Sequence, residues 1–143
     1  MSLLSKLHYK YKVAASTLRS NDNEVNELME FSKILIPNDF IEVIKEQSEI
    51  EINVDNKKYI RIWGASGCIE MNNAYKIQDN ISSSLAIADD EGGNVLVYAT
   101  RKSEFGLYIV ALNDLEIDEM QFIARSLSDL LVHGHGIHKI IDF

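Results

Sequence analysis

The chain has 143 residues, of which 46% are apolar and 25% are charged. This length and composition are typical of one globular domain that buries a core without help from disulfides or metals. The sequence holds no run of about 18 apolar residues, which argues against a membrane-spanning helix. Its one cysteine, Cys68, has no partner for an internal disulfide, which is typical of a protein of the reducing cytoplasm.

Charge is distributed unevenly along the chain, whose formal net charge is −8. Residues 1–19 contain four of the fourteen basic residues and none of the twenty-two acidic ones, so residues 20–143 carry a net charge of −12. An acidic body repels phosphate backbones, which argues against nucleic-acid binding by the main domain. It would attract a basic protein and speed encounter with it, although an excess of acidic residues also serves solubility alone.

The basic N-terminal segment, residues 1–21, is predicted to be a helical arm beside a main domain of residues 22–143. A short amphipathic helix lying on the domain is the simplest interpretation, and a peripheral arm or a targeting segment is the alternative. No linker rich in proline, glycine or serine divides the chain. The apolar side chains at helical spacing in the arm are Leu4, Leu7, Tyr11, Ala14 and Leu18.

Two helices are predicted next, on either side of the only proline. Asn21 and Glu24 have the spacing of a capping box, which indicates a helix that begins at residue 22. The apolar residues that carry this helix toward residue 35 are Val25, Leu28, Met29 and Leu35. Pro37 suits the first turn of a second helix because it lacks an N–H that would need a partner. The buried side chains of that helix are expected to be Phe40, Ile41 and Ile44.

The period of the apolar pattern then changes from 3.6 to 2, which is typical of strands. Residues 49–54 and 59–63 both alternate around a turn at residues 55–58, and they predict a hairpin with one wet face. Residues 64–84 form an irregular connection with a short helical piece near residues 70–75. Three more strands are expected, separated by a glycine-rich acidic turn and a charged turn, at residues 85–88, 95–99 and 107–112.

A last helix is predicted over residues 120–131, with Gly134 as its C-terminal cap and a mobile tail after it. Its apolar face would comprise Met120, Ile123, Ala124, Leu127, Leu130 and Leu131. The order of helices, strands and helix indicates an α+β single domain. We therefore expect an antiparallel sheet of about five to six strands that is flanked by helices.

No group of residues has the pattern of a catalytic site. Ser66 lies in a segment that lacks the last glycine of a nucleophile elbow, and no parallel sheet surrounds it. Cys68 is interpreted as a buried filler rather than a nucleophile. Glu49 and Glu51 share the wet face of a strand and are interpreted as solvated, not as a glycosidase pair. We therefore expect a binding protein and not an enzyme, with no cofactor.

Three histidines near the C-terminus are the strongest metal-ligand candidates, since His133, His135 and His138 could bind zinc together with Asp142. The alternative is a helix end followed by a flexible tail, in which the glycines would make a metal site costly to order. We expect no metal site. The acidic turn at residues 89–91 lacks the ligand spacing of an EF-hand loop.

Several segments, taken in order, resemble the SUKH superfamily of Smi/Knr-type domains over residues 22–133. They are an apolar-Pro-x-x-aromatic helix start (Ile36–Phe40), an apolar strand ending in Trp63, Asn72 or Asn73 before Tyr75, the strand and acidic glycine turn of residues 85–94, and the helix of residues 123–131. Leu127 stands where the family often has phenylalanine. The resemblance implies an α+β fold. It also implies that bacterial members are often immunity proteins that block a toxin domain, frequently a nuclease, inside the producing cell, whereas fungal members resemble regulatory adaptors.

The resemblance and the charge together lead to a functional expectation. We expect a cytoplasmic protein that binds a basic partner, a toxin domain, with an intracellular regulatory adaptor as the alternative and a metal-binding protein or enzyme as the third hypothesis. Trp63 and Tyr75 could anchor an interface or belong to the core. The candidate partner-binding residues are Glu70, Asn72, Asn73, Asp89, Asp90 and Glu91.

Overall fold

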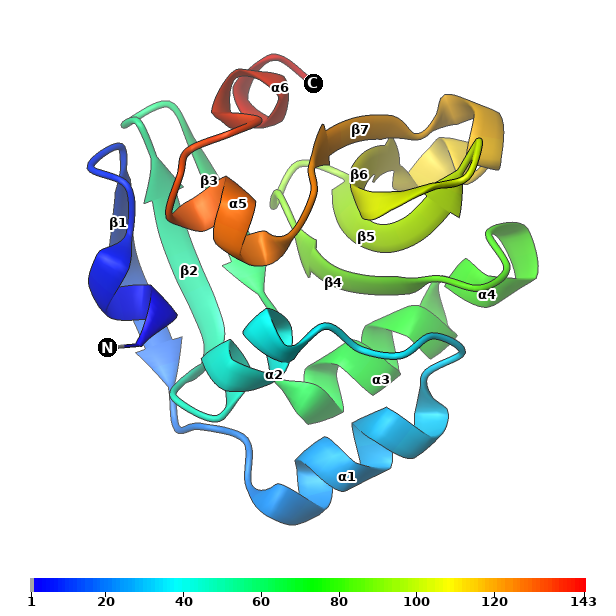
Figure 1. Cartoon of the computed structure of the whole chain (residues 1–143), viewed down its shortest axis with the longest axis horizontal. Helices are drawn as coiled ribbons and strands as arrows, with labels where there is room; N and C mark the ends of the chain where they lie inside the picture. Colours follow the sequence, from blue (N-terminus) through cyan, green and yellow to red (C-terminus); the bar gives the residue numbers. More distant parts are fainter. Residues whose placement is uncertain (1) are drawn as a thin grey trace.

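The computed structural model describes residues 2–143 and contains one seven-stranded antiparallel sheet with helices packed against it (Figure 1). The strands are β1 (Tyr11–Thr17), β2 (Ser48–Val54), β3 (Lys58–Ile62), β4 (Leu85–Asp89), β5 (Asn94–Arg101), β6 (Glu104–Ala111) and β7 (Gln121–Ala124). The α-helices are α1 (Asp22–Phe31), α2 (Asn38–Ile44), α3 (Ala65–Ala74), α4 (Ile77–Asn80), α5 (Leu127–Leu131) and α6 (Ile137–Asp142). Short 3-10 helices lie at Leu3–Lys6, Leu112–Asp114 and Ile117–Glu119.

Each strand pairs with its neighbours in the sequence, so the sheet order follows the chain from β1 to β7. The predicted α+β class with one antiparallel sheet is confirmed, but the sheet has seven strands rather than five or six. The two additional strands, β1 and β7, come from segments that were predicted to be helical. Within residues 2–143, no helix has the length and apolar content that crossing a membrane requires.

Strand β1 replaces the predicted N-terminal helix, and that prediction was wrong. Val13 pairs with Ile52 of β2, and the Tyr11 hydroxyl donates to the Leu130 carbonyl oxygen at 3.0 Å. Leu18, expected on the buried stripe, is 87% exposed. The segment adopts the strand because pairing with β2 satisfies its backbone, whereas a short isolated helix would have had few buried contacts to stabilise it.

The predicted helix at residues 120–131 is also corrected, because its first part is strand β7, paired with β6. Helix α5 begins only after Ser126, whose side chain accepts a hydrogen bond from the Asp129 N–H. The apolar positions of the pattern are buried as expected, so the spacing identified burial and not conformation. The chain after Gly134 is not a mobile tail, since it forms α6 and buries Ile137 and Ile140.

Helices α1 and α2 begin where they were predicted to begin, but α1 ends earlier than predicted. The capping box of α1 is present, with Glu24 N to Asn21 Oδ1 at 2.9 Å and Asn21 N to Glu24 Oε1 at 2.8 Å. Helix α1 ends at Phe31, and Leu35 lies beyond it with 94% of its surface exposed. Pro37 is the N-cap of α2, whose predicted apolar residues are all buried.

A buried network joins α2, α5 and the sheet, and these two helices lie together in front of the sheet in Figure 1. The Tyr98 hydroxyl of β5 donates to Asp39 Oδ1 at 3.0 Å and accepts from the Leu127 N–H at 2.7 Å. Asp39 Oδ2 also accepts from the Ser128 N–H at 2.9 Å. The network satisfies the first N–H groups of α5, which would otherwise lack partners.

The β2–β3 hairpin is confirmed and gives the sheet its two faces. On β2, Ile50, Ile52 and Val54 are buried, and the alternate residues are partly exposed. The register pairs Glu51 with Arg61 across the hairpin. Directly opposed residues of antiparallel strands share a face, so these polar side chains form an outer face opposite the isoleucine core.

Candidate functional site

The acidic turn between β4 and β5 was predicted to bind a partner, and the structure divides its residues into buried and exposed ones. Asp90 is buried, and its Oδ1 accepts from the N–H groups of Gly92 (2.9 Å) and Asn94 (3.0 Å). Its Oδ2 accepts from Asn94 Nδ2 at 2.7 Å and forms an ion pair with Lys58 at 2.9 Å. The carboxylate of Asp90 is thus occupied within the protein by the turn's own backbone, by Asn94 and by Lys58, and the structure lends no support to its predicted contact with a partner.

Asp90 and Lys58 also connect the turn to the C-terminal helix, since Lys58 Nζ donates to the Ile140 carbonyl oxygen at 2.9 Å. Burial acts to raise the pKa of Asp90, but the hydrogen bonds from Asn94, Lys58 and Gly92 outweigh it and hold the pKa below its ordinary value. The carboxylate is thus an ionised structural element at neutral pH.

Asn72 of α3 is another predicted site residue that the structure places in the interior. Its Nδ2 donates to the carbonyl oxygens of Cys68 (2.7 Å) and Ala86 (2.8 Å). Its Oδ1 accepts from the Ala86 N–H at 3.0 Å and from Gln78 Nε2 at 2.9 Å. Because the Asn72 side chain is fully buried and paired within the protein, the structure lends no support to its predicted contact with a partner either. Cys68 is buried beside it, as expected.

The other four predicted residues reach the surface at different places. Asn73 and Glu70 are exposed on α3, and Glu91 is exposed at the tip of the acidic turn. Asp89 is partly exposed, and its Oδ2 accepts from Trp63 Nε1 at 2.8 Å. Trp63 is therefore a buried residue that orients Asp89, whereas the second proposed anchor, Tyr75, is exposed at the C-cap of α3.

A charged cluster on the outer face brings the acidic turn next to the hairpin. Arg61 Nη2 lies 3.4 Å from Glu51 Oε2 and 3.9 Å from Glu91 Oε1, and Arg61 is paired in register with Asp89. Partial burial raises the pKa of Glu91, the Glu51 carboxylate raises it further, and Arg61 acts in the opposite direction. The single guanidinium of Arg61 therefore lies among more than one carboxylate, and the cluster retains a net negative charge.

A groove of ≈ 330 Å³ adjoins this cluster where β2 meets the first turn of α3. Three carboxylates line it, from Glu24, Glu49 and Glu70, together with the exposed Leu18. Glu49 Oε2 accepts from the Gly64 N–H at 2.7 Å. Hydrogen bonds from the Asn21 N–H and the Ser66 hydroxyl hold the pKa of Glu24 below its usual range.

We use the term acidic surface for the groove and the charged cluster together, which are joined by β2. Its residues are Glu24, Glu49, Glu51, Arg61, Glu70, Asp89 and Glu91. Sequence reasoning identified Glu70, Asp89 and Glu91 and omitted the rest. The alternation of residues 49–54 with 59–63 was the available signal, because the register of the hairpin places Glu51 opposite Arg61.

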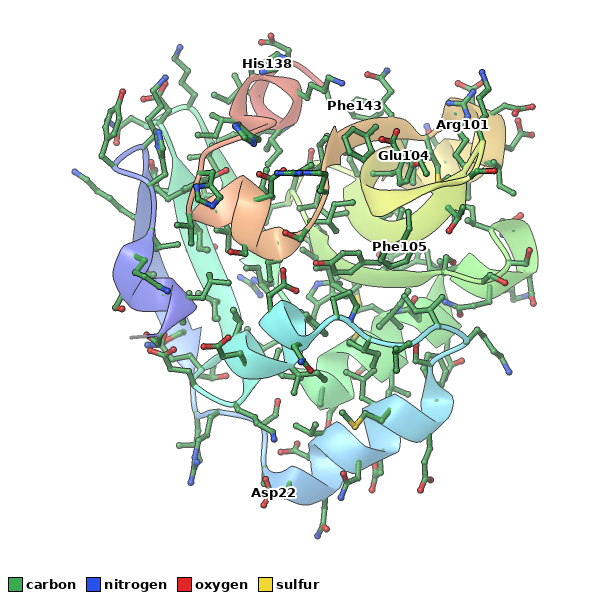
Figure 2. The ribbon with its side chains drawn as sticks, viewed as in Figure 1. Asp22, Arg101, Glu104, Phe105, His138 and Phe143 are labelled. Atoms are coloured by element: carbon green, nitrogen blue, oxygen red, sulfur yellow. The ribbon has the colours of Figure 1, made fainter. Side chains whose placement is uncertain are left out.

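The C-terminal histidines do not converge. His135 Nδ1 lies 2.6 Å from Asp129 Oδ1, and the ring centroids of His133 and His135 are 6.2 Å apart. His138 lies apart from both, on the exposed surface of α6 (Figure 2). Among residues 2–143, no group of three or more His, Cys, Asp or Glu side chains is arranged to hold a metal ion. Burial acts to raise the pKa of Asp129, but bonds from the Arg125 N–H and His135 hold it below its ordinary value.

One family of known proteins matches this sequence. The sequence model of the SMI1 / KNR4 family (SUKH-1) matches residues 20–133, which is most of the chain. The chain belongs to this family. A search of curated proteins finds no match.

Membership of the SUKH-1 family agrees with the resemblance found in the sequence and gives its motifs a physical meaning. The Trp63 indole donates a hydrogen bond to Asp89, and the Asn72 side chain accepts one from the Ala86 N–H. The Asp90 carboxylate accepts hydrogen bonds from the backbone of the acidic turn. These motif residues stabilise the fold from within. The SUKH-1 family is consistent with an immunity-type binding role.

Proposed function

We propose that this SUKH-1 protein is an immunity protein that binds a cognate toxin domain in the cytoplasm and blocks it without chemistry. The observation that carries the proposal is the acidic surface, which holds six carboxylates and one guanidinium in a chain of the SUKH-1 family. A protein surface with one dominant sign of charge attracts partners of the opposite sign and raises the rate of encounter.

A nuclease toxin is the class of partner that suits this charge. Enzymes that cleave nucleic acids bind phosphates through lysine and arginine side chains, so their active-site clefts are basic. Carboxylates at the positions of phosphates would pair with those side chains and occupy the cleft. Binding alone would then neutralise the toxin, so the SUKH-1 chain would need no catalytic group of its own.

The other polar contacts of the acidic surface also favour binding over catalysis. Ser66 donates its hydroxyl to Glu24 Oε2 at 2.9 Å, but the pKa of Glu24 is held below its usual range, so this carboxylate is a weak base for activating a nucleophile. Glu49 is held by a backbone N–H, and Glu51 by Arg61. These groups are positioned acceptors, which is what recognition of cationic side chains requires.

Co-expression with candidate toxin domains encoded by neighbouring genes tests the proposal. We expect the toxin domain to arrest growth alone, and the wild-type chain to restore growth and to form a complex of defined stoichiometry with it in size-exclusion chromatography. A chain carrying Asn73→Ala, outside the acidic surface, should protect equally well. Undiminished toxicity in the presence of the folded wild-type chain would contradict the proposal, and a complex with a non-toxic regulatory protein instead would favour the adaptor.

A further inference from the structure

A second hollow lies away from the acidic surface and gathers two motifs that the proposed function leaves unused. It is a pocket of ≈ 380 Å³ between residues 8–10, the turn that joins β2 to β3, and α6. The basic aromatic run His8–Lys12 and the C-terminal histidine segment, 120 residues apart in sequence, both contribute to it. Its volume lies within the range of small-molecule pockets, about 300–1,000 Å³.

An aromatic ring forms one wall of the pocket and is held in place. Tyr9 is 80% exposed, and its ring stacks on His8 with 4.5 Å between centroids and 28° between planes. His8 is fixed in turn, because its Nδ1 accepts from the Lys10 N–H at 3.2 Å and its ring lies against Gly134. Gly134 has φ +77°, and a Cβ at that position would lie 2.6 Å from the His8 ring. A supported, exposed aromatic face is what base stacking requires.

Two lysines flank the same pocket and come from different segments. The Asp55 N–H donates to the Lys10 carbonyl oxygen at 2.7 Å, and this bond holds the turn that carries Lys57 next to residues 8–10. Among residues 2–143, neither Lys10 nor Lys57 forms an ion pair. Their ammonium groups are therefore available to a phosphate, which lysine binds as a point charge.

The remaining lining residues supply an apolar base and acceptors. Ile137 and Ile141 of α6 are the apolar part, and His138 lies beside them on the surface of the same helix (Figure 2). Asp55 and Asp142 also line the pocket and balance the charge of the two lysines. Carboxylates in such a place accept hydrogen bonds from sugar hydroxyls or an exocyclic amino group, and they disfavour ligands with several phosphates.

We propose that this pocket binds a nucleoside monophosphate, with the base stacked on Tyr9, the phosphate between Lys10 and Lys57, and the ribose hydroxyls toward Asp55 or Asp142. One ring, one phosphate and hydroxyl donors match the three kinds of group that line the pocket. The site is separate from the acidic surface and does not depend on the proposed function. Longer nucleic acids are disfavoured, because additional phosphates would meet a chain whose residues 20–143 carry a net charge of −12.

Titration of AMP into the ¹⁵N-labelled full chain, followed by amide chemical shifts, tests the proposal. We expect saturable shifts confined to residues 8–10, 55–57 and 134–142, with weaker binding of adenosine and of inorganic phosphate than of AMP. Binding of inorganic phosphate as tight as that of AMP would overturn the stacking role and with it the proposal. Tighter binding of a single-stranded oligonucleotide than of AMP would also overturn it. So would the absence of any shift at about 10 mM AMP, a concentration about a hundredfold above a dissociation constant of about 0.1 mM.

Variants at exposed positions make the test specific. Tyr9→Ala should weaken AMP binding by about tenfold and leave phosphate binding unchanged, since only stacking is lost. Lys57→Gln should weaken both ligands by roughly fivefold. Lys102→Gln, at the exposed turn between β5 and β6, is the matched control and should bind as the wild type does. Equal losses in Lys57→Gln and Lys102→Gln would show a general charge effect and contradict the site.

Discussion

Replacement of Asn72 by alanine should destabilise the domain by more than any surface substitution, because this side chain completes the edge of a strand. Strand β3 ends at Ile62 and the chain turns away into α3, so at Ala86 strand β4 is paired with β5 on one side and has no strand on its β3 side. The Asn72 amide takes that place, since it donates to the Ala86 carbonyl oxygen and accepts from the Ala86 N–H. It acts at this position as a backbone peptide group of a neighbouring strand would.

The expected magnitude follows from the groups that lose a partner. Asn72→Ala leaves the Ala86 N–H buried without a hydrogen bond and leaves the Ala86 carbonyl oxygen only the weak thiol donor of Cys68 at 3.1 Å, and each poorly paired buried group costs about 1–3 kcal/mol. We therefore expect the free energy of unfolding to fall by about 2–5 kcal/mol, and the melting temperature by roughly 6–15 °C. Urea unfolding followed by circular dichroism measures the loss as a lower midpoint at unchanged slope.

The neighbouring residue provides a matched control. Asn73 is exposed, so Asn73→Ala should change the free energy of unfolding by no more than about 0.5 kcal/mol. Asn72→Asp should be as damaging as Asn72→Ala, because a carboxylate can accept from the Ala86 N–H but faces the Ala86 carbonyl oxygen without a donor. A loss for Asn72→Ala that matches the loss for Asn73→Ala would refute the strand-edge argument.

Two further predictions concern buried polar groups. The pKa of Asp90 is held below its ordinary value, so its contribution to stability is present above the unfolded pKa of about 3.9 and is lost as the pH falls through the folded pKa. Lys58→Met should therefore lower the melting temperature at pH 7 and reduce the difference between pH 7 and pH 3, and an unchanged pH profile would contradict this. Tyr98→Phe removes the hydroxyl that joins Asp39 to the Leu127 N–H and should cost about 1–3 kcal/mol in urea unfolding, whereas a neutral effect would show that the network is dispensable.

Much of the fold could be read from local patterns. The β2–β3 hairpin follows from strict alternation, and the start of α1 follows from the Asn21–Glu24 capping box, because each depends on neighbours within a few residues. The two edge strands could not be read this way. In β1 only Tyr11 is buried, so no alternation marks the strand, and its conformation depends on pairing with β2.

Strand β7 shows a different limit of sequence reasoning. Met120, Ile123, Ala124 and Leu127 have helical spacing, and all four are buried. The first three nevertheless lie in or beside a strand, because pairing with β6 supplies the backbone hydrogen bonds that a helix would have made. Periodicity reports which side chains face a core, and tertiary pairing decides how the backbone places them there.

The candidate site was predicted in part, and its errors have a common cause. Charge and amide groups at Asn72 and Asp90 were taken as signs of exposure, but backbone N–H groups left by a turn or a strand end also need buried acceptors. Asp90 is followed by Gly92 and Asn94, the composition of a turn closed by its own aspartate, and this signal was available. Exposure could not be read for single residues, because it depends on which strands come together.

The most direct test of a binding role for the acidic surface is the association rate with the proposed toxin domain, measured by stopped flow at low and high salt. We expect Glu51→Lys with Glu91→Lys to slow association by roughly tenfold at low salt and by much less at high salt, because steering by surface charge is screened. Asp114→Lys with Glu116→Lys, two exposed positions outside the acidic surface, changes the net charge equally and should have a small effect. Equal slowing in both double variants, or no salt dependence in the wild type, would contradict the account.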